Sequence, residues 1–565
     1  MPLDYRNINL LWASVLVETL HRLGLQTAVV CPGSRSAPLA IALAAHPEIE
    51  AIPALDERSA SFFALGCAKR HCRAVAVVCT SGTAGANFYP AVIEAQESQV
   101  PLLLLTADRP PELRRCGAGQ AIDQQKLYGA AARWYAELAL PAAARLPYLR
   151  QVIVQAWGRA HYPTPGPVHL NLPFRTPLSP LSDGAALDPL PASFFIGVAP
   201  AVPPQSTLAL PPDLPPRGVI IAGVAAPADP ERYCDAIARL SKQTGFPVLA
   251  EGLSPVRNWA SRQPCLVTTY DSILRSPARA KALTPQAVLQ IGPLPTSKVL
   301  RQWLSQTDAR RWVVASTSDL DPTHGRTVHL RGEVTQLVLS GAPAEPRAPE
   351  YVQRWRDADA QARQRLHAAL AQSPPANESA VARLLSRHLP PQTPLIIANS
   401  TPVRDVEWFW AAGDREIVPY VNRGANGIDG TLSTALGVAH GQRPSLLLTG
   451  DLALLHDTNG FLLQPQFRGH LTIVLINNGG GGIFELLPIA QFDPPFTEFF
   501  ATPQTVDIAL LCQSYGVSYR RVEGREALVA AISTLPDRGI RLLEMKCDRK
   551  TSAQWRRSLF EAFEA

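Results

Sequence analysis

The sequence predicts an α/β protein made of three tandem α/β domains with mostly parallel sheets. Short apolar runs alternate with longer stretches of helical periodicity along most of the chain. Several of these runs are apolar throughout, which is expected where helices cover both faces of a parallel sheet. The chain has 565 residues, too many for one hydrophobic core and enough for about three domains.

The first α/β domain is expected over residues 1–180. Its predicted strands lie at residues 27–31, 49–55, 74–79, 101–106 and 166–173. Helical stretches separate these runs, as in a parallel sheet with crossover helices. The segment before the first strand is amphipathic and carries Glu18 and Arg22, so we predict that it is neither a signal peptide nor a membrane anchor.

Two further α/β domains are expected beyond this one. Residues 181–217 are rich in Pro, Ala and Ser and form a predicted linker. A central domain is expected over residues 218–345, with strands at 219–222, 248–250, 287–291 and 312–315. Residues 346–377 are a predicted linker helix, whose charged part at 351–372 is expected to be exposed. The third domain is expected over residues 378–565.

Composition argues against nucleic-acid and membrane partners. The net charge is +6 and there is no dense Lys and Arg stripe with interleaved aromatic residues, whereas a slight positive balance suits small anionic substrates. No apolar run approaches the ~20 residues that a membrane-spanning helix needs. The nine cysteines are scattered and odd in number, which is typical of reduced thiols in a cytoplasmic protein.

The segment 449–484 contains the clearest candidate binding motif. Apolar runs at 445–448 and 471–476 end at Asp451 and at Asn478, with roughly one helix between them and four glycines after Asn478. In a parallel sheet both polar ends lie at one edge, where such sheets bind ligands. Carboxylate and amide oxygens suit Mg²⁺, and glycines let the backbone approach a phosphate. Taken alone, Gly-Asp after a strand is more often a simple turn.

The spacing of these two motifs resembles the diphosphate and magnesium motif of thiamine diphosphate enzymes. The resemblance implies thiamine diphosphate as cofactor and Mg²⁺, with Mn²⁺ as an alternative metal. It implies that the metal is held by side-chain oxygens of Asp451 and Asn478 and by the backbone carbonyl of Gly480.

Glu57 is the expected upstream partner of this motif. It follows a predicted strand and begins a predicted helix, where an acidic residue is also favoured simply by the helix dipole. The resemblance to thiamine diphosphate enzymes implies more: that Glu57 hydrogen-bonds the aminopyrimidine ring and promotes the imino tautomer that removes the thiazolium C2 proton.

Five motifs narrow the resemblance. They are PGSRSAP at 32–38, TSGTAGA at 80–86, TADRPPE at 106–112, GPVHLNLP at 166–173 and NRGANGIDG at 422–430. Together they resemble the 2-succinyl-5-enolpyruvyl-6-hydroxy-3-cyclohexene-1-carboxylate (SEPHCHC) synthase family of menaquinone biosynthesis. This implies a transferase that decarboxylates 2-oxoglutarate and adds the resulting succinyl carbanion equivalent to isochorismate in a 1,4-addition, releasing CO₂.

The same resemblance implies the residues of the substrate pocket. Both substrates are dianions, so several cations should hold their carboxylates in fixed orientation. The cations at the matching positions are Arg35, Arg109, Lys298, Arg404 and Arg423. The matching neutral hydrogen-bonding residues are Ser34, Gln120 and Ser400. Taken singly, such residues are more often surface charges, turns or helix caps.

Apolar residues complete the implied site. Ile428 would support the cofactor in its bent shape, although a plain core isoleucine is nearly as common. Ile483, Phe484 and Leu487 would line the apolar side of the pocket. An apolar wall disfavours the zwitterionic starting state and so helps decarboxylation.

Three positions depart from the family pattern. Val299 stands where relatives often carry a second cation, Gly119 where they often have Asn, and Gly482 where they often have Gln. The first weakens any claim that Lys298 belongs to a cationic pair. The other two affect the detailed substrate contacts.

Three alternatives remain from the residues themselves. One is another thiamine diphosphate-dependent 2-oxoacid decarboxylase or carboligase. A second is a nicotinamide oxidoreductase, although glycines 479–482 lack the G-x-G-x-x-G pattern. A third is a non-catalytic paralogue, against which Glu57, Asp451 and Asn478 are all present.

Assembly is the last expectation. The glutamate and the metal motif belong to different predicted domains, and the resemblance implies that the site is completed across a dimer interface. We therefore expect a homodimer or homotetramer.

Overall fold

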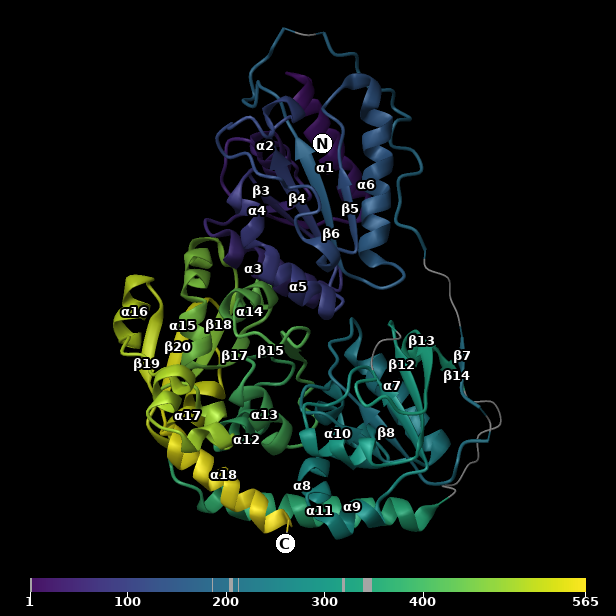
Figure 1. Ribbon diagram of the computed structural model, residues 1–565, viewed down its shortest axis with the longest axis vertical. Coiled ribbons are helices and arrows are strands. Elements are labelled where there is room, and N and C mark those ends of the chain that lie inside the picture. The colour runs from purple at the N-terminus through teal and green to yellow at the C-terminus, as the bar shows by residue number, and fades with distance from the viewer. Residues whose placement is uncertain are drawn as a thin grey trace. The chain divides into compact units, whose positions relative to one another are not determined.

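The described part of the chain contains three six-stranded sheets, in which neighbouring strands are parallel (Figure 1). The computed structural model describes residues 3–184, 186–202, 207–211, 213–317, 321–338 and 348–564. Each expected α/β domain contains one of the sheets, so the predicted fold class is confirmed. The predicted domain boundaries stay a prediction.

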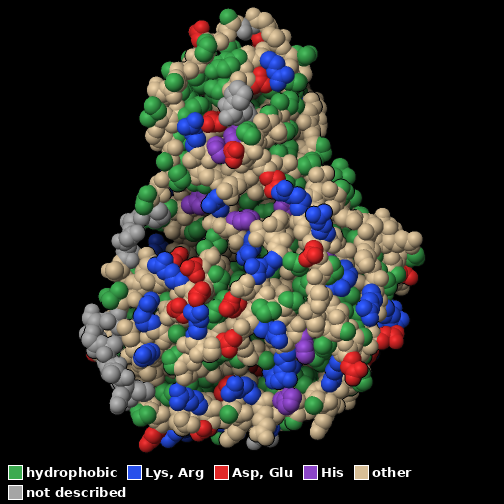
Figure 2. Space-filling view, turned by 180° about the vertical axis from the view of Figure 1, so that it is seen from behind, with side chains coloured by type: hydrophobic (Ala, Val, Ile, Leu, Met, Phe, Trp, Pro, Cys, Tyr) green, Lys and Arg blue, Asp and Glu red, His purple; other side chains and the backbone are tan. Residues whose placement is uncertain are grey.

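Internal contacts divide the chain into two compact units. Unit 1 comprises Met1–Pro204, Asn422–Gly441 and His456–Arg468, and unit 2 comprises Gln205–Val421, Gln442–Leu455 and Gly469–Ala565. Figure 2 shows one face of the molecule, on which Lys and Arg side chains lie among Asp and Glu side chains.

The sheet of unit 1 has the strand order β2-β1-β3-β4-β6-β5. Its strands are β1 Thr27–Val30, β2 Glu50–Pro53, β3 Val75–Cys79, β4 Leu102–Asp108, β5 Trp134–Glu137 and β6 Pro167–Pro173. Its helices are α1 Ile8–Leu23, α2 Ala37–Ala44, α3 Glu57–His71, α4 Thr83–Asn87, α5 Tyr89–Glu97, α6 Leu146–His161 and α14 Thr431–Ala439. All five predicted strands of this region are confirmed, with ends shifted by a few residues.

Helix α1 is buried more completely than an amphipathic surface helix would be. Thirteen of its sixteen residues are buried, including Asn9 and Glu18. The Glu18 carboxylate is balanced by Arg22, whose Nε donates to Glu18 Oε1 at 2.7 Å. The amphipathic prediction for this segment was therefore wrong in degree, because a few polar residues that find partners can lie inside the core.

Helices α3 and α14 pack with unusually close backbones. A Cβ added at Gly66 would lie 2.1 Å from the Thr434 carbonyl oxygen, and one added at Gly437 would lie 2.0 Å from the Phe63 carbonyl oxygen. No side chain fits either position, so the two glycines allow the contact. This contact fixes helix α3, which begins at Glu57, against the segment that follows the NRGANGIDG motif.

The central sheet, in unit 2, has the order β10-β9-β8-β11-β12-β13. Its strands are β8 Gly218–Ala222, β9 Val248–Ala250, β10 Leu266–Val267, β11 Ala287–Ile291, β12 Arg310–Ala315 and β13 Thr327–Arg331. Its helices are α7 Pro230–Thr244, α8 Tyr270–Leu274, α9 Pro277–Ala282 and α10 Lys298–Ser305. Strands β7 Leu208–Ala209 and β14 Leu337–Val338 form a separate parallel pair.

The third sheet, also in unit 2, has the order β16-β15-β17-β18-β20-β19. Its strands are β15 Leu395–Ile397, β16 Pro419–Val421, β17 Ser445–Gly450, β18 His470–Asn477, β19 Ser518–Arg521 and β20 Gly539–Lys546. Its helices are α12 Ser379–His388, α13 Thr401–Phe409, α15 Asp451–His456, α16 Ile508–Ser514, α17 Gly524–Ile532 and α18 Arg549–Glu564. The single helix predicted between β17 and β18 is in fact α15 followed by a 3₁₀ segment, Thr458–Gln466.

Helix α11, Pro349–Gln372, corrects the prediction of an exposed linker helix. One face is exposed and charged, but Trp355, Ala362 and Leu366 are buried in the largest apolar core of unit 2. The many Arg and Gln residues of this segment mark only the outer face, and the 3.6-residue spacing of the apolar residues defines the inner one.

All nine cysteines are free thiols, and six of them are buried. Across the part of the chain that the structure describes, no helix combines the length and the apolar character that crossing a membrane requires.

His169 of β6 makes unit 1 sensitive to acid. Its ring is fully buried, and Nε2 lies 2.8 Å from Thr106 Oγ1. Burial lowers the pKa of His169 from 6.5 to about 3. Between these values the unfolded chain binds a proton that the folded chain does not, so stability falls as pH drops from about 6.5 towards 3.

We expect the free energy of unfolding of the β4–β6 region to be about 2 kcal/mol lower at pH 5 than at pH 7.5. The reason is that pH 5 lies about 1.5 units below the pKa of the unfolded histidine, and each unit corresponds to about 1.4 kcal/mol. Urea titrations at the two pH values, read by pulsed hydrogen exchange of β6 peptides, measure this loss. The variant His169→Gln should show a smaller pH difference. An equal difference in both proteins would contradict the assignment to His169.

Candidate active site

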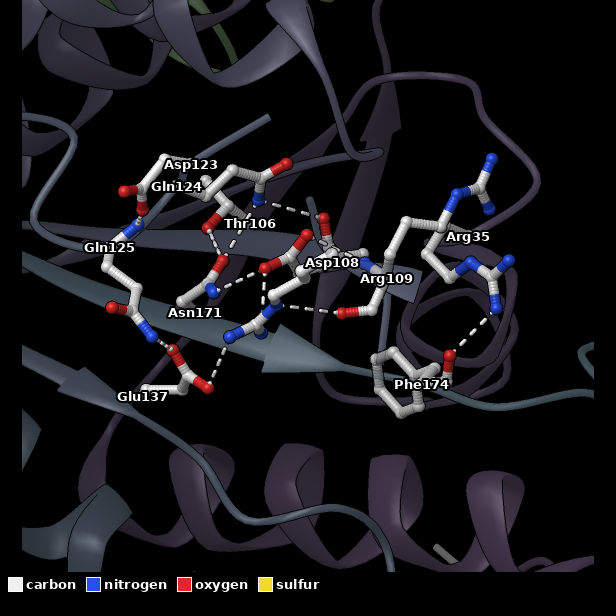
Figure 3. Close-up of polar contacts among 12 residues, drawn as sticks. Arg35, Thr106, Asp108, Arg109, Asp123, Gln124, Gln125, Glu137, Asn171 and Phe174 are labelled. Atoms are coloured by element: carbon white, nitrogen blue, oxygen red, sulfur yellow. Dashed lines mark hydrogen bonds and ion pairs between the residues drawn. The ribbon is translucent and has the colours of Figure 1, made fainter. Parts of the chain in front are cut away.

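Two arginines lie at the carboxyl edge of the sheet of unit 1. Ser34 and Arg35 follow β1, and Arg109 follows β4. Arg35 is buried and its Nη1 donates to the Phe174 carbonyl oxygen at 2.7 Å (Figure 3). Burial, and after it the positive charge of Arg109, lowers the pKa of Arg35. Two neighbouring cations of this kind form a place where an anion would be stabilised.

The Arg35 side chain has unused hydrogen-bonding capacity. Its Nε is buried and finds no hydrogen-bond partner among the described residues. Buried polar groups without partners are rare in folded proteins and often belong to binding sites. Ser34, in contrast, is exposed at the same loop.

A buried polar network fixes the loop that carries Arg109. The Arg109 N–H donates to Asp108 Oδ1 at 2.7 Å (Figure 3). The Arg109 Nε donates to the Gly119 carbonyl oxygen at 3.0 Å. Asp108 in turn receives Asn171 Nδ2 at 2.8 Å and pairs with Arg114 at 2.9 Å. Burial raises the pKa of Asp108. The Arg109 backbone is therefore held rigidly.

Gln120 lies on the same loop, next to the carbonyl that Arg109 binds. It is exposed and has a left-handed φ of 55°. A Cβ added at the neighbouring Gly119 would meet nothing within 4 Å, so this departure from the family pattern is not forced by packing.

Glu57 is the first residue of α3 and is half-buried. The helix N-cap is the neighbouring Asp56, which accepts from Ser59 N–H at 2.9 Å and from Asn459 Nδ2 at 2.6 Å. Capping therefore does not use Glu57. Burial, and after it the Glu57 carboxylate, raises the pKa of the Cys79 thiol at the end of β3. Glu57 thus lies beside the carboxyl ends of the strands.

Glu94 of α5 fixes the loop that carries Arg423. Its carboxylate is buried and accepts from the N–H groups of Gly424 at 3.0 Å and Ala425 at 2.8 Å, and pairs with Lys69 at 3.2 Å. Arg423 and Ile428 are half-buried on this loop. Sequence reasoning missed Glu94, since an acidic residue inside a helix carries no signal of the loop it binds.

Ser400 and Arg404 lie at the start of α13, after β15. Arg404 Nη1 donates to the Ser400 carbonyl oxygen at 2.6 Å. Ser400 has φ 73° and ψ −128°, a region that non-glycine residues seldom adopt and that is most often found at functional sites. This conformation holds the two residues in a fixed relation.

Lys298 is the exposed first residue of α10 and follows the N-cap Ser297. The next residue, Val299, packs against the largest core of unit 2. The departure at Val299 therefore places an apolar side chain in the core and leaves Lys298 as a single cation at this position.

Asp451 and Asn478 both follow the carboxyl ends of neighbouring strands of the third sheet. The register pairs Gly450 with Ile476, which places Asp451 level with Asn477, one residue before Asn478. Asp451 Oδ2 accepts from the Gly480 N–H at 2.7 Å. Burial raises the pKa of Asp451 to about 6, against the effect of the N–H donors of Gly480 and Leu452.

These groups fit a hard divalent cation. Asn478 Oδ1 is buried and has no hydrogen-bond partner within the described ranges. The Asp451 carboxylate is also buried. Gly480 has φ 124°, and a Cβ there would lie 2.2 Å from the Ala501 carbonyl oxygen. The Gly480 carbonyl accepts from Gly482 N–H at 2.8 Å and keeps a second lone pair. A carboxylate, an amide oxygen and a carbonyl are donors that Mg²⁺ prefers.

The three predicted apolar residues follow this turn. Ile483 and Phe484 are half-buried, and Leu487 is 39% exposed. The Phe484 ring packs edge-on against Phe500 at 5.9 Å. At Gly482 an added Cβ would lie 2.6 Å from Asn478 Nδ2, so glycine suits this position in this chain.

The predicted residues are therefore divided between the two units. Those of unit 1 are Ser34, Arg35, Glu57, Arg109, Gln120, Arg423 and Ile428. Those of unit 2 are Lys298, Ser400, Arg404, Asp451, Asn478, Gly480, Ile483, Phe484 and Leu487. Ser34, Arg35, Arg109, Asp451 and Asn478 follow the carboxyl ends of parallel strands or begin the helix after one.

Family comparisons cover most of the chain. The N-terminal domain model of thiamine pyrophosphate enzymes (thiamine diphosphate under its other name) matches residues 12–127. The middle-domain model matches residues 214–397, and the C-terminal thiamine pyrophosphate-binding domain model matches residues 408–545.

Comparisons over the whole chain identify which thiamine pyrophosphate enzymes it is similar to in sequence. A Nostoc protein named 2-succinyl-5-enolpyruvyl-6-hydroxy-3-cyclohexene-1-carboxylate synthase is 56% identical and covers 100% of this chain and 99% of its own length. A Synechococcus elongatus protein of the same name is 55% identical over 99% of this chain and 97% of its own length. The crystal structure of benzoylformate decarboxylase from Polynucleobacter necessarius shares the fold, with a TM-score of 0.67, 16% identity and coverage of 95% and 98%. The chain belongs to the 2-succinyl-5-enolpyruvyl-6-hydroxy-3-cyclohexene-1-carboxylate synthase family of thiamine pyrophosphate enzymes.

Proposed function

We propose that this enzyme is a SEPHCHC synthase: it decarboxylates 2-oxoglutarate and adds the remaining four-carbon unit to isochorismate, releasing CO₂, in menaquinone biosynthesis. The observation that carries the proposal is 56% identity over the whole chain to a relative named for this product. Two observations support it: the neighbouring Arg35 and Arg109 of unit 1 suit dianionic substrates, and Asn478 Oδ1, which has no hydrogen-bond partner among the described residues, suits a metal that binds a diphosphate.

The cofactor of the proposed reaction is thiamine diphosphate with Mg²⁺, or Mn²⁺ in its place. When bound, thiamine diphosphate supplies an electron sink for the carbon that loses CO₂. Asp451, Asn478 and the Gly480 carbonyl would hold the metal. Their fit rests on the unpartnered Asn478 oxygen and on the buried Asp451 carboxylate.

The cations would bind and orient the substrate carboxylates. Arg35 and Arg109 are held by backbone and side-chain contacts, so each presents its remaining N–H groups in a fixed direction. Arg404, Lys298 and Arg423 would bind the other carboxylates, with Arg423 placed by the loop that Glu94 anchors. Such fixed donors orient a substrate before reaction and lower the entropy lost in reaching the transition state.

Neutral and apolar residues would complete the pocket. Ser34, Gln120 and Ser400 would donate or accept hydrogen bonds to the substrates. Ile428 would support the shape of the cofactor, and Ile483, Phe484 and Leu487 would exclude water from its apolar side.

Glu57 would hold a proton at the aminopyrimidine ring of the cofactor. Its half-buried place at the strand edge, outside the capping of α3, leaves its carboxylate available for this contact. A carboxylate hydrogen-bonded to a ring nitrogen can donate a proton to it or accept one from it, and its pKa decides how readily the transfer occurs.

The test of the proposed function is a direct assay. Purified protein with thiamine diphosphate, Mg²⁺, 2-oxoglutarate and isochorismate should consume isochorismate and release CO₂ in equal amounts. Another thiamine diphosphate-dependent 2-oxoacid decarboxylase or carboligase would release CO₂ without consuming isochorismate. That outcome would overturn the proposal and favour the alternative.

Replacement of Asp451 should weaken cofactor retention. We expect Asp451→Ala to bind thiamine diphosphate with Mg²⁺ at least about tenfold more weakly, because one of few metal oxygens is lost. Equilibrium dialysis with labelled thiamine diphosphate measures the change. The matched control is Asp213→Ala, which removes an exposed carboxylate of unit 2. Equal retention by both variants would contradict the metal assignment.

We also propose a homodimer or homotetramer in the cytoplasm, with sites completed between subunits. The nine free thiols support a reducing compartment. Light scattering after size-exclusion chromatography gives the mass of the assembly. A monomer that remains fully active would overturn the shared-site part of this proposal.

A further inference from the structure

Asn478, a proposed metal ligand, is held by a buried side chain outside the family motifs. Glu378 precedes α12 and is only 2% exposed. Its Oε2 accepts from Asn478 Nδ2 at 2.8 Å, and its Oε1 accepts from Arg556 Nη1 at 2.6 Å. Arg556 of α18 also binds Asp405 of α13, through Nη2 at 2.7 Å and Nε at 3.0 Å. Four separate elements of unit 2 thus meet around one ion cluster.

The carboxylate determines which way the Asn478 amide points. A carboxylate paired with an arginine only accepts hydrogen bonds, so the NH₂ group of Asn478 must face Glu378. The amide oxygen then points away from Glu378. That oxygen is buried and finds no partner in the part of the chain that is described. This acceptor belongs to the turn that also carries Gly480, whose N–H donates to Asp451 Oδ2 at 2.7 Å.

Helix capping does not account for these contacts of Glu378. Glu378 stands at the N-cap position of α12, yet its side chain makes no capping hydrogen bond. Asn377 accepts from Ser379 N–H at 2.9 Å instead. Among the described residues, the Glu378 carboxylate accepts hydrogen bonds from Arg556 and Asn478.

We infer that Glu378 is a positioning residue that orients Asn478 Oδ1 for the metal, with Arg556 holding Glu378 in place. The inference rests on the proposed function, because it concerns the proposed metal. Asp405 extends the cluster to α13, which carries Arg404 one position earlier. Arg556 therefore holds both Glu378, which binds Asn478, and α13, the helix that presents Arg404.

The first experiment replaces the acceptor-only group with an amide. In Glu378→Gln the new side chain can donate as well as accept, so the Asn478 amide is no longer held in one orientation. We expect Mg²⁺ to bind about 10- to 100-fold more weakly, as found when partners of metal ligands are lost. Isothermal titration of Mg²⁺ into protein with saturating thiamine diphosphate measures this without turnover.

Asp359→Asn is the matched control. Asp359 is also a buried carboxylate of unit 2, which accepts from Thr268 N–H at 3.0 Å and pairs with Arg363 at 2.9 Å. It has no recorded contact to the metal residues among those described. We expect wild-type Mg²⁺ affinity in this variant. A loss as large as that of Glu378→Gln would show a general packing effect and overturn the inference.

A double-variant cycle tests orientation directly. Asn478→Asp should bind Mg²⁺ poorly, since two carboxylates would then face each other. The double variant Glu378→Gln with Asn478→Asp exchanges donor and acceptor while keeping the total charge. We therefore expect its Mg²⁺ affinity to be at least about tenfold higher than the affinity obtained by combining the two single losses. Additive losses would overturn the inference. Wild-type protein that takes up no Mg²⁺ would overturn the proposed function as well, whereas wild-type uptake with unchanged Glu378→Gln would overturn the inference alone.

Discussion

Glu57→Gln should lower kcat about 10³-fold while the protein remains folded. The substitution keeps the size of the side chain but removes the carboxylate that would hold a proton at the aminopyrimidine ring, and a positioned acid or base contributes about 10²–10⁴ in rate. The fold should survive because capping of α3 depends on Asp56, not on Glu57. Isochorismate consumption measures kcat, and far-ultraviolet circular dichroism reports the fold.

Two further measurements isolate this effect. Binding of thiamine diphosphate to Glu57→Gln should stay within about tenfold of wild type, because an amide still makes a hydrogen bond to the ring. Glu48→Gln removes an exposed carboxylate of the same unit and should leave kcat unchanged. Near-normal turnover by Glu57→Gln would show that the proton is handled by another group.

The strand-edge residues could be predicted from the sequence because their signal is local. The apolar runs that became β17 and β18 end next to Asp451 and Asn478, and parallel strands bring their carboxyl ends to one edge. Arg35 and Arg109, which the resemblance implied, also follow strands, β1 and β4, and the structure brings them close enough for the charge of Arg109 to lower the pKa of Arg35. Glu57 at the start of α3 also followed from the order of strand and helix.

Tertiary contacts could not be predicted in this way. Glu378 and Asn478 are 100 positions apart in the chain, and nothing near Glu378 indicates a buried acceptor. Glu94 and the loop it fixes are more than 300 positions apart. The inner face of α11 is hard to predict because many charged residues surround its few apolar ones, yet Trp355 lies fully buried on that face.

Unusual backbone conformations and close backbone contacts could not be predicted from the sequence either. The positive φ of Ser400 belongs to a residue type that normally avoids it, so only the structure reveals this conformation. Gly66 and Gly437 look like ordinary helix glycines in the sequence, yet they allow α3 and α14 to touch. In each case the conformation depends on residues that are distant in the sequence, and the spacing of apolar residues does not indicate such contacts.

Arg556→Met should be the most destabilising substitution predicted here. The Arg556 side chain is buried and pairs with both Glu378 and Asp405. Removing a buried cation while leaving its carboxylates costs about 3–5 kcal/mol, since the remaining charges lose their compensation. Urea titration read by hydrogen exchange of α18 and β18 peptides measures the loss. Arg354→Met, which removes an exposed guanidinium of α11, should change stability little.

The loss of stability in Arg556→Met should also depend on pH, because the Asp405 carboxyl is left without its cation. Burial raises the pKa of Asp405 to about 6, while Arg556 acts to lower it. Without Arg556 the pKa of folded Asp405 rises further above its unfolded value, so the folded variant binds the extra proton. Stability of Arg556→Met should therefore fall as pH rises from about 4 through 6 and beyond. The added change Asp405→Asn should recover part of the loss at pH 8, because it removes one uncompensated charge; no recovery would show that packing around the guanidinium, not its charge, holds these helices together.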